Sequence, residues 1–194
     1  SGLPLHSASP EIIGNITPDW VGGIRNTFNY KDLSLSILID GRKGGDIFSV
    51  TDWFGAYAGI TEETAEGDIR ENGLIVEGVK EDGTPNDVVV SAQDYYENYW
   101  GLHEPSIIDG SFIKLREIVL AYDLPQKWMD ATGFLTSVNF SLYARNIALL
   151  YTDESNDVGI DPETGFGTSN AGMGLEQFQL PPTRSIGFKF KFNF

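Results

Sequence analysis

The sequence predicts an all-β protein, an antiparallel transmembrane β-barrel fragment with long acidic loops. Three observations predict this fold class. Five segments alternate apolar and polar side chains with the period of two that gives a strand two unlike faces. Short turns between these segments alternate with long loops. The last segment has only apolar, mostly aromatic side chains on one face.

The first two predicted strands, 22–30 and 33–40, form a hairpin. Only residues 31 and 32 lie between them, which leaves room for a tight turn and nothing longer. Leu38 is the residue that interrupts the alternation. The apolar face consists of Ile24, Phe28, Tyr30, Leu33, Leu35, Ile37 and Ile39, and the polar face of Arg25, Thr27, Asn29, Ser34, Ser36 and Asp40.

The third predicted strand, 112–124, has two unlike halves. Its second half alternates regularly, whereas Lys114 and Arg116 make the first half mixed. This mixture predicts either a β-bulge or a strand that rises past its apolar zone. The regular apolar positions are Ile118, Leu120, Tyr122 and Leu124.

The fourth predicted strand, 137–145, follows a short connection. Residues 126–131 suit one or two helical turns that end before Gly133, because glycine readily adopts the left-handed conformation that terminates helices. The strand then alternates cleanly. Its apolar positions are Val138, Phe140, Leu142 and Ala144, and its polar positions are Ser137, Asn139, Ser141, Tyr143 and Arg145.

The fifth predicted strand, 183–194, is the most strongly amphipathic. A soluble sheet can bury such an apolar face under a second layer, so the alternation alone leaves a soluble fold open. A transmembrane strand needs the same alternation over roughly ten residues, with lipid on one side and a wet lumen on the other. The apolar face consists of Ile186, Phe188, Phe190, Phe192 and Phe194, and the polar face of Ser185, Gly187, Lys189, Lys191 and Asn193.

Two long segments, 41–111 and 150–182, contain most of the acidic residues. Residues 50–110 include 14 acidic side chains against Arg70 and Lys80, and 150–182 include six without a lysine or arginine. Structureless loops longer than ~15 residues are uncommon in compact soluble domains. Transmembrane β-barrels have short turns on one side of the membrane and long loops on the other. The loop lengths therefore favour the barrel.

The composition excludes several function classes. The chain of 194 residues contains no cysteine, which removes disulfides and thiolate metal sites. No stretch approaches the ~18 consecutive apolar residues of a transmembrane helix. A formal net charge of −15 argues against a nucleic-acid partner, because the phosphates would be repelled.

The segment 109–125, DGSFIKLREIVLAYDLP, closely resembles the C-terminal barrel portion of the SusC/RagA family of TonB-linked outer-membrane transporters. The resemblance covers nearly the whole chain in the right order. It continues through 143–150 (YARNIALL), 159–163 (GIDPE) and 182–184 (PTR), and earlier includes 14–18 (GNITP), 26–31 (NTFNYK), 79–86 (VKEDGTPN) and 92–96 (AQDYY).

The resemblance implies a plugged barrel of about 22 strands in the outer membrane of a Gram-negative bacterium. Residues 1–194 would supply its last five strands or so, with 41–111 and 150–182 as extracellular loops. The plug domain and the segment that contacts TonB would lie upstream and are absent here. Ser34, Ser36, Asn139, Ser141 and Arg145 would line the lumen, and Ile37, Phe140, Leu142 and Phe190 would face lipid.

The resemblance also implies a function and a set of partners. Members of the family import glycans or peptides with energy passed on by TonB, and a SusD-like surface lipoprotein closes over the barrel as a lid. The expected partners are the SusD-like lipoprotein, the TonB complex through the missing N-terminal part, the outer-membrane assembly machinery, the lipid bilayer and a glycan or peptide cargo. A nucleic acid is not among them.

Two groups of aromatic residues are candidate contact sites. The terminal phenylalanines resemble the signal that outer-membrane assembly machinery recognises, although they also suit a lipid-facing strand; they are Phe188, Phe190, Phe192 and Phe194. The first acidic loop contains a second group, near Phe54 and Tyr57. Four roles are open for these aromatic side chains: they stack on sugar rings, clamp a peptide, contact the lid protein, or pack the loop against itself. They are Trp53, Tyr95, Tyr96, Tyr99 and Trp100, and packing is the first expectation.

The acidic residues of the second loop suggest calcium, because calcium prefers oxygen ligands. They are Asp153, Glu154, Asp157, Asp161 and Glu163. Their spacing does not match the EF-hand loop, so a solvated acidic loop is the first expectation. His6 and His103 are far apart in sequence and support no transition-metal site. No nucleophile elbow or phosphate-binding loop occurs, and we expect a protein that is not an enzyme and has no cofactor.

A soluble, secreted β-sandwich that binds carbohydrate is the alternative. It would place the same apolar faces between two packed sheets. The two hypotheses differ in what covers Ile186, Phe188 and Phe190: a second sheet of the same chain in the sandwich, and lipid or detergent in the barrel.

Overall fold

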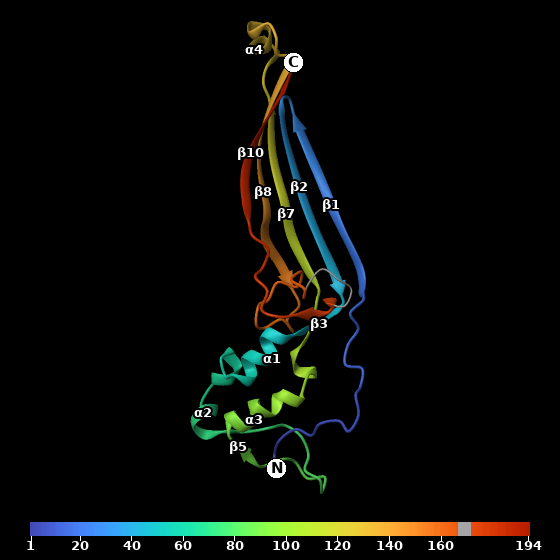
Figure 1. Ribbon diagram of the computed structural model, residues 1–194, viewed down its shortest axis with the longest axis vertical. Helices are drawn as coiled ribbons and strands as arrows, with labels where there is room; N and C mark the ends of the chain where they lie inside the picture. Colours follow the sequence, from blue (N-terminus) through green and yellow to red (C-terminus); the bar gives the residue numbers. More distant parts are fainter. Residues whose placement is uncertain (167–171) are drawn as a thin grey trace.

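A long antiparallel sheet is the main feature of the computed structural model, which describes residues 1–166 and 172–194 (Figure 1). The strands follow the order β1-β2-β7-β8-β10, and β1 and β10 form the two edges. Their bounds are β1 (Pro18–Tyr30), β2 (Leu33–Gly44), β7 (Phe112–Asp123), β8 (Ser137–Thr152) and β10 (Ser185–Asn193). These are the five predicted strands, and they pair antiparallel as predicted. The chain is mostly β and not all-β, because short helices form in the segments between the strands.

Three of the predicted boundaries are wrong by four residues or more. β1 begins at Pro18 instead of residue 22. β2 continues to Gly44 instead of ending at residue 40, and β8 continues to Thr152 instead of residue 145. In both strands the added residues no longer alternate apolar with polar, so periodicity does not detect them. Pairing with β1 and β7 keeps them extended.

The register of the strands gives the sheet one apolar face. Leu142 lies opposite Leu120 on β7 and Phe188 on β10, and Leu120 lies opposite Leu35, which in turn lies opposite Phe28. An apolar row therefore crosses all five strands. The side chain of Phe188 is 68% exposed, so within the described residues no second layer covers this row. The two packed sheets that the sandwich alternative requires are absent from this part of the chain.

The opposite face of the sheet is polar. Ser36 pairs with Thr27 on β1 and with Val119 on β7, and Ser141 pairs with Lys189 on β10. The residues expected to line a lumen all lie on this face: Ser34, Ser36, Asn139, Ser141 and Arg145. The residues expected to face lipid all lie on the apolar face: Ile37, Phe140, Leu142 and Phe190.

A β-bulge at Arg116 explains the mixed first half of β7. Leu38 pairs with Glu117 and Ile39 with Leu115, which leaves Arg116 between them without a partner in the register. Because a bulge inserts one extra residue, two consecutive side chains reach the same face. Arg116 and Glu117 consequently both make ion pairs on the polar face. Of the two alternatives for this half of the strand, the bulge is confirmed.

The strands are joined by short turns at the end of the sheet that carries the C-terminus (Figure 1). Lys31 has a φ of 52° in the tight turn between β1 and β2. Between β7 and β8 lies the helix α4 (Gln126–Thr132), which ends at Gly133 in the left-handed conformation as predicted. Met129 is buried and fixes this helix to the end of the sheet.

The long segments gather at the other end of the sheet and are folded (Figure 1). A three-stranded sheet forms there, in which β3 pairs antiparallel with β6 and parallel with β9, and β4 and β5 form a separate two-stranded sheet. The elements are β3 (Asp46–Ser49), α1 (Val50–Tyr57), η1 (Glu62–Ala65), α2 (Ile69–Asn72), β4 (Leu74–Ile75), β5 (Val89–Val90), α3 (Ala92–Asn98), η2 (Tyr99–Gly101), η3 (Glu104–Ser106), β6 (Ile107–Asp109) and β9 (Leu175–Glu176). We call this part the loop unit. Residues 167–171 of the predicted loop 150–182 lie outside the described residues.

The elements of the loop unit depend on packing and caps, because each is too short to be stable alone. Serine side chains cap α1 and α3: Ser49 accepts from the backbone N–H of Asp52, and Ser91 accepts from that of Asp94. The core consists of Ala56, Ala92, Tyr96 and Tyr99. In the described residues no helix is long and apolar enough to cross a membrane.

We predict that Lys31→Gly raises the free energy of unfolding by about 0.5–1 kcal/mol, because glycine adopts a positive φ without the steric cost that lysine bears. Denaturant unfolding of the intact protein measures this difference. Lys31→Val serves as the opposite control, since a β-branched side chain disfavours this conformation most. Equal stabilities of the two variants would contradict the assigned backbone conformation.

Candidate functional site

A set of ion pairs connects the strands on the polar face of the sheet. Glu117 on β7 accepts from Arg25 on β1 at 2.9 Å and from Arg145 on β8 at 2.8 Å. Both arginine side chains are largely exposed, so each pair contributes little to stability by itself. The two ion pairs bring charged side chains from three strands, β1, β7 and β8, together at one place on the polar face.

A second, more buried set fixes part of the loop after β8 to this face. Lys114 is buried and donates to both carboxylate oxygens of Asp161, at 2.6 and 2.7 Å, and to Glu163 at 2.6 Å. Arg116 donates to Glu163 through two nitrogens, at 2.8 and 2.7 Å, and to Asp40 at 2.8 Å. A buried ammonium requires such partners, since its desolvation is otherwise very costly. Residues 161–163 are thereby held against β7.

The same contacts determine the protonation of Glu163. Burial acts to raise the pKa of Glu163, but hydrogen bonds from Arg116 and Lys114 outweigh it and lower the pKa below its usual value. The carboxylate is therefore charged at neutral pH. Its contribution to stability is present at neutral pH and is lost as the pH falls through the lowered pKa.

The five acidic residues considered for calcium do not form one cluster. Asp161 and Glu163 contact Lys114 and Arg116, whereas Asp153 accepts from the backbone and hydroxyl of Ser155 in its own turn. Within the described residues, no group of three or more acidic or histidine side chains has the arrangement of a metal site. Calcium on the acidic loops stays a prediction.

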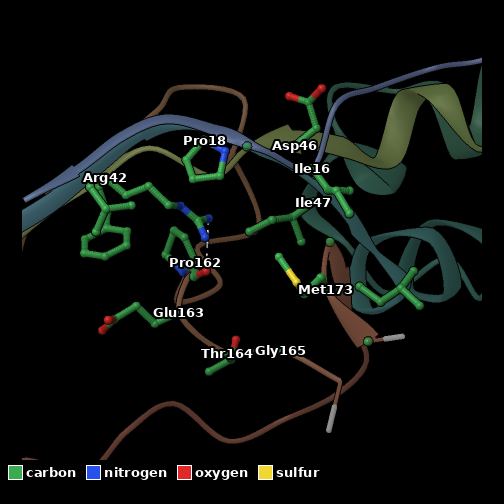
Figure 2. A pocket seen from close by; sticks show the side chains of 16 residues that line it. Ile16, Pro18, Arg42, Asp46, Ile47, Pro162, Glu163, Thr164, Gly165 and Met173 are labelled. Carbon is green, nitrogen blue, oxygen red and sulfur yellow. Dashed lines mark hydrogen bonds between the residues drawn. The ribbon is translucent and has the colours of Figure 1, made fainter. Parts of the chain in front are cut away.

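A cavity of about 470 Å³ lies where the sheet meets the loop unit (Figure 2). Arg42 reaches across it and donates to the carbonyl of Pro162 at 3.3 Å and to that of Gly110 at 2.9 Å. Asp46, also at the wall, accepts from the backbone N–H of Asn15 at 2.6 Å. Because these charged groups have partners within the chain, we assign no ligand to this cavity.

Three of the five aromatic residues proposed for the first loop are part of its core. Tyr96 and Tyr99 are each only 7% exposed, and Tyr95 packs against both. The hydroxyl of Tyr96 donates to the carbonyl of Glu63 at 3.2 Å. Burial raises the pKa of Tyr96 to about 12 and raises the pKa of Tyr99 further. These three tyrosines pack the loop, which was the first expectation.

The two tryptophans belong to a different group. Trp53 donates its indole N–H to the carbonyl of Tyr99 at 2.8 Å and packs edge-on against His103. Its other face stacks on Trp100 at 4.8 Å between ring centroids. Trp100 itself is 54% exposed. Trp53 is therefore a packing residue that holds the ring of Trp100 in place, and Trp100 is exposed at the surface.

Trp100 is part of an exposed aromatic group, which we call the aromatic platform. Its ring centroid lies 5.4 Å from that of Tyr57 and 5.7 Å from that of Phe54, and Phe54 lies 6.0 Å from Phe178. The platform consists of Phe54, Tyr57, Trp100 and Phe178. Phe178 lies far from the other three in sequence, in the second acidic segment, and its own segment contains no aromatic pattern. Sequence reasoning therefore missed it.

A buried carboxylate holds Phe178 in the platform. Glu176 is 1% exposed and accepts from the hydroxyls of Ser49 at 2.9 Å and Thr51 at 2.6 Å, at the N-terminus of α1. A helix N-terminus favours an anion at this place. The Thr51 hydroxyl also accepts from the backbone N–H of Phe178 at 2.9 Å. Phe178 adopts a φ of 55°, which is uncommon for an aromatic residue and requires such support.

The terminal phenylalanines lie on the apolar face of β10 and are exposed. The rings of Phe140 and Phe190 are 4.8 Å apart, and that of Phe194 stacks on Phe134. Their recognition by an assembly machinery stays a prediction. The residues concerned are Phe188, Phe190, Phe192 and Phe194.

Two curated proteins of Formosa agariphila resemble the chain in sequence. The TonB-dependent receptor P3 is 26% identical over 198 residues, which cover 97% of this chain and 18% of that protein. The TonB-dependent receptor P26 is 26% identical over 199 residues, with 93% and 18% covered. The chain thus spans about a fifth of the length of these relatives. No family model matches the chain.

Solved structures of a RagAB peptide importer have the same fold over nearly the whole chain. The open-open state gives a TM-score of 0.60 at 20% identity and covers 98% of this chain and 19% of that one. The closed-closed state gives a TM-score of 0.61 at 19% identity and covers 96% and 18%. The resemblance identified from the sequence is confirmed: the chain corresponds to the C-terminal segment of larger TonB-dependent receptors. None of these names is that of an enzyme, which agrees with the expected non-enzymatic function.

We predict that Lys114→Met releases residues 161–163 from the sheet, because two carboxylates lose their buried partner. The expected loss is about 3 kcal/mol in the free energy of unfolding, together with faster proteolysis between residues 153 and 166. Lys43→Met is the matched control. Its ion pair with Asp109 is exposed to solvent, so the loss is expected to be much smaller than for Lys114→Met. Equal protease sensitivity of the two variants would show that Lys114 does not hold this segment.

We predict that the loop unit loses stability between pH 10 and 12. The raised pKa of Tyr96 means that the folded state holds this proton more tightly than the unfolded state, so the stabilisation is complete below pH 10 and disappears as the pH rises through about 12. Absorbance at 295 nm follows the ionisation, and near-UV circular dichroism follows the packing. Tyr96→Phe should remove the absorbance change near pH 12 that the ionisation of Tyr96 causes. An unchanged titration of this variant would show that the raised pKa does not belong to Tyr96.

Proposed function

We propose that this chain is part of a TonB-dependent outer-membrane transporter that imports peptides or glycans together with a SusD-like surface lipoprotein. The observation that carries the proposal is the apolar row from Phe28 to Phe188. It crosses all five strands of the long sheet, and no described part of the chain covers it. Such a face requires an apolar environment, and in a transporter the lipid bilayer supplies it.

The strand lengths support a membrane-spanning sheet. Four of the strands have 12 to 16 residues and β10 has nine. Strands of soluble proteins usually have five or six residues, whereas a tilted transmembrane strand needs about nine to eleven. All five strands are therefore long enough to cross the hydrocarbon layer, and the added length of β8 reaches the loop unit.

The polar face supports a wet lumen wall. Its ion pairs, such as those of Glu117 with Arg25 and Arg145, would be very costly against lipid but are stable in a water-filled interior. The short turns and the loop unit lie at opposite ends of the sheet (Figure 1). Because transmembrane barrels have short turns on the periplasmic side and long loops outside, the loop unit would form the extracellular vestibule and contact the lid lipoprotein.

The two edges of the sheet indicate how the chain is completed. β1 and β10 are long strands with unpaired backbone groups on one side, and exposed edges of this kind promote aggregation. We propose that further strands of the intact protein pair with both edges and close the barrel, and that the plug and the TonB-contacting segment belong to that remainder. The cargo class follows only from the relatives, among which RagAB is a peptide importer by name.

Substitutions on the two faces of the sheet test its orientation. We predict that Leu142→Arg destabilises the membrane-inserted protein by about 2–4 kcal/mol, because it places a charge in lipid near the bilayer midplane. Thr27→Arg on β1 is the matched control, since Thr27 is exposed on the polar face and the new side chain should enter the lumen and change stability little. Unfolding from lipid vesicles measures both, and uptake of a labelled cargo by cells reports whether the barrel still works.

Two outcomes would overturn the proposal. Equal effects of the two arginines in lipid would mean that the sheet does not separate lipid from water. A monomer that is stable in water without detergent, with Leu142 protected from solvent, would favour the soluble carbohydrate-binding alternative.

A further inference from the structure

The aromatic platform presents more apolar ring surface than packing of the loop unit requires. Trp100 and Phe178 are 54% and 58% exposed, and Phe54 and Tyr57 join them in one contiguous group. The core of the unit lies elsewhere, around Tyr96. Contiguous exposed aromatic groups of this kind typically mark binding surfaces.

The platform is preorganised. The indole of Trp53 is fixed by its hydrogen bond to the Tyr99 carbonyl and supports Trp100 from behind. On the other side, Glu176 and Thr51 hold Phe178 in its unusual backbone conformation. A rigid aromatic surface loses little conformational entropy when a ligand binds, which raises affinity.

The charge around the platform restricts what it can bind. Residues 50–110 include 14 acidic side chains and only two basic ones, and both basic ones are engaged within the unit. Arg70 donates to the carbonyls of Thr64 and Gly59, and Lys80 pairs with Asp87 at 2.9 Å. The segment that supplies Phe54, Tyr57 and Trp100 therefore has a strongly negative net charge, which attracts cations and repels anions at long range.

We propose that the aromatic platform binds peptide segments that carry lysine or arginine side chains. This inference rests on the proposed transport function, whose ligand class it narrows. A guanidinium or ammonium group over the ring of Trp100 or Tyr57 gains a cation–π interaction, and the negative net charge of the segment adds long-range attraction. A neutral sugar would stack on the rings but gain nothing from the charge. A uronate or sulfated glycan would be repelled.

A charge series of one peptide tests the proposal. The probe is a synthetic octapeptide of glycine, leucine and arginine, compared with versions in which glutamine or glutamate replaces each arginine. Tryptophan fluorescence of the intact protein measures binding at low and at 0.5 M salt. The arginine peptide should bind at least tenfold more tightly than the glutamine version and weaken with salt, and the glutamate version should not bind.

Substitutions locate the binding site. Trp100→Ala should weaken binding of the arginine peptide about tenfold, and Trp100→Phe should retain part of it, because a ring remains. Trp128→Ala is the control, since this exposed tryptophan lies on α4 at the opposite end of the sheet. Circular dichroism verifies that the loop unit of each variant is folded, and Tyr57→Ala provides a second test if Trp100→Ala is not.

The proposal is overturned if the glutamine peptide or a neutral oligosaccharide such as maltohexaose binds as tightly as the arginine peptide. It is also overturned if folded Trp100→Ala and Tyr57→Ala variants both bind normally. These results would leave the transporter function untouched, because that function is tested by the contrast between Leu142→Arg and Thr27→Arg, which involves neither the platform nor its charge.

Discussion

The cross-strand register of the five-stranded sheet is the constraint on which the rest of the structure depends. Side chains alternate along a strand, so a slip of one residue would mix the two faces. The pairing of Leu142 with Leu120 and of Ser141 with Ala121 keeps them apart. Where the third strand must supply two consecutive charges to one face, the bulge at Arg116 provides the extra residue without disturbing the pairing beyond it. The polar wall and the apolar row both follow from this arrangement.

Most of this sheet could be predicted from the sequence, because periodicity reports directly on a face. The five strands, the tight turn at Lys31 and the helix that ends at Gly133 all have local signals. The predicted ends at residues 40 and 145 were too early, since pairing alone extends the strands beyond them. The acidic segments 41–111 and 150–182 show no periodicity from which their short helices and strands could be predicted. Their helices have at most eight residues and exist only because they pack on one another.

The candidate site was predictable only in part, and the division has a physical reason. Trp53 and Trp100 stand out as aromatic residues in an acidic loop, but sequence cannot separate a ring in a core from a ring at a surface. Tyr96 is in the core, whereas Trp100 is exposed. Phe178 joins this surface because it contacts Phe54 on α1 and because the buried Glu176 holds its segment at the start of that helix. Long-range contacts of this kind cannot be recognised from local composition.

The clamp between Glu176 and the start of α1 has a consequence for the order of events during biosynthesis. The two partners are separated by 127 residues, so the clamp cannot form before Glu176 has been synthesised. Contacts of such high sequence separation are slow to form, because a long loop must close first. The hairpin of the first two strands, by contrast, needs only neighbouring residues. The surface that carries Phe178 is therefore expected to form later than the pairing of β1 with β2.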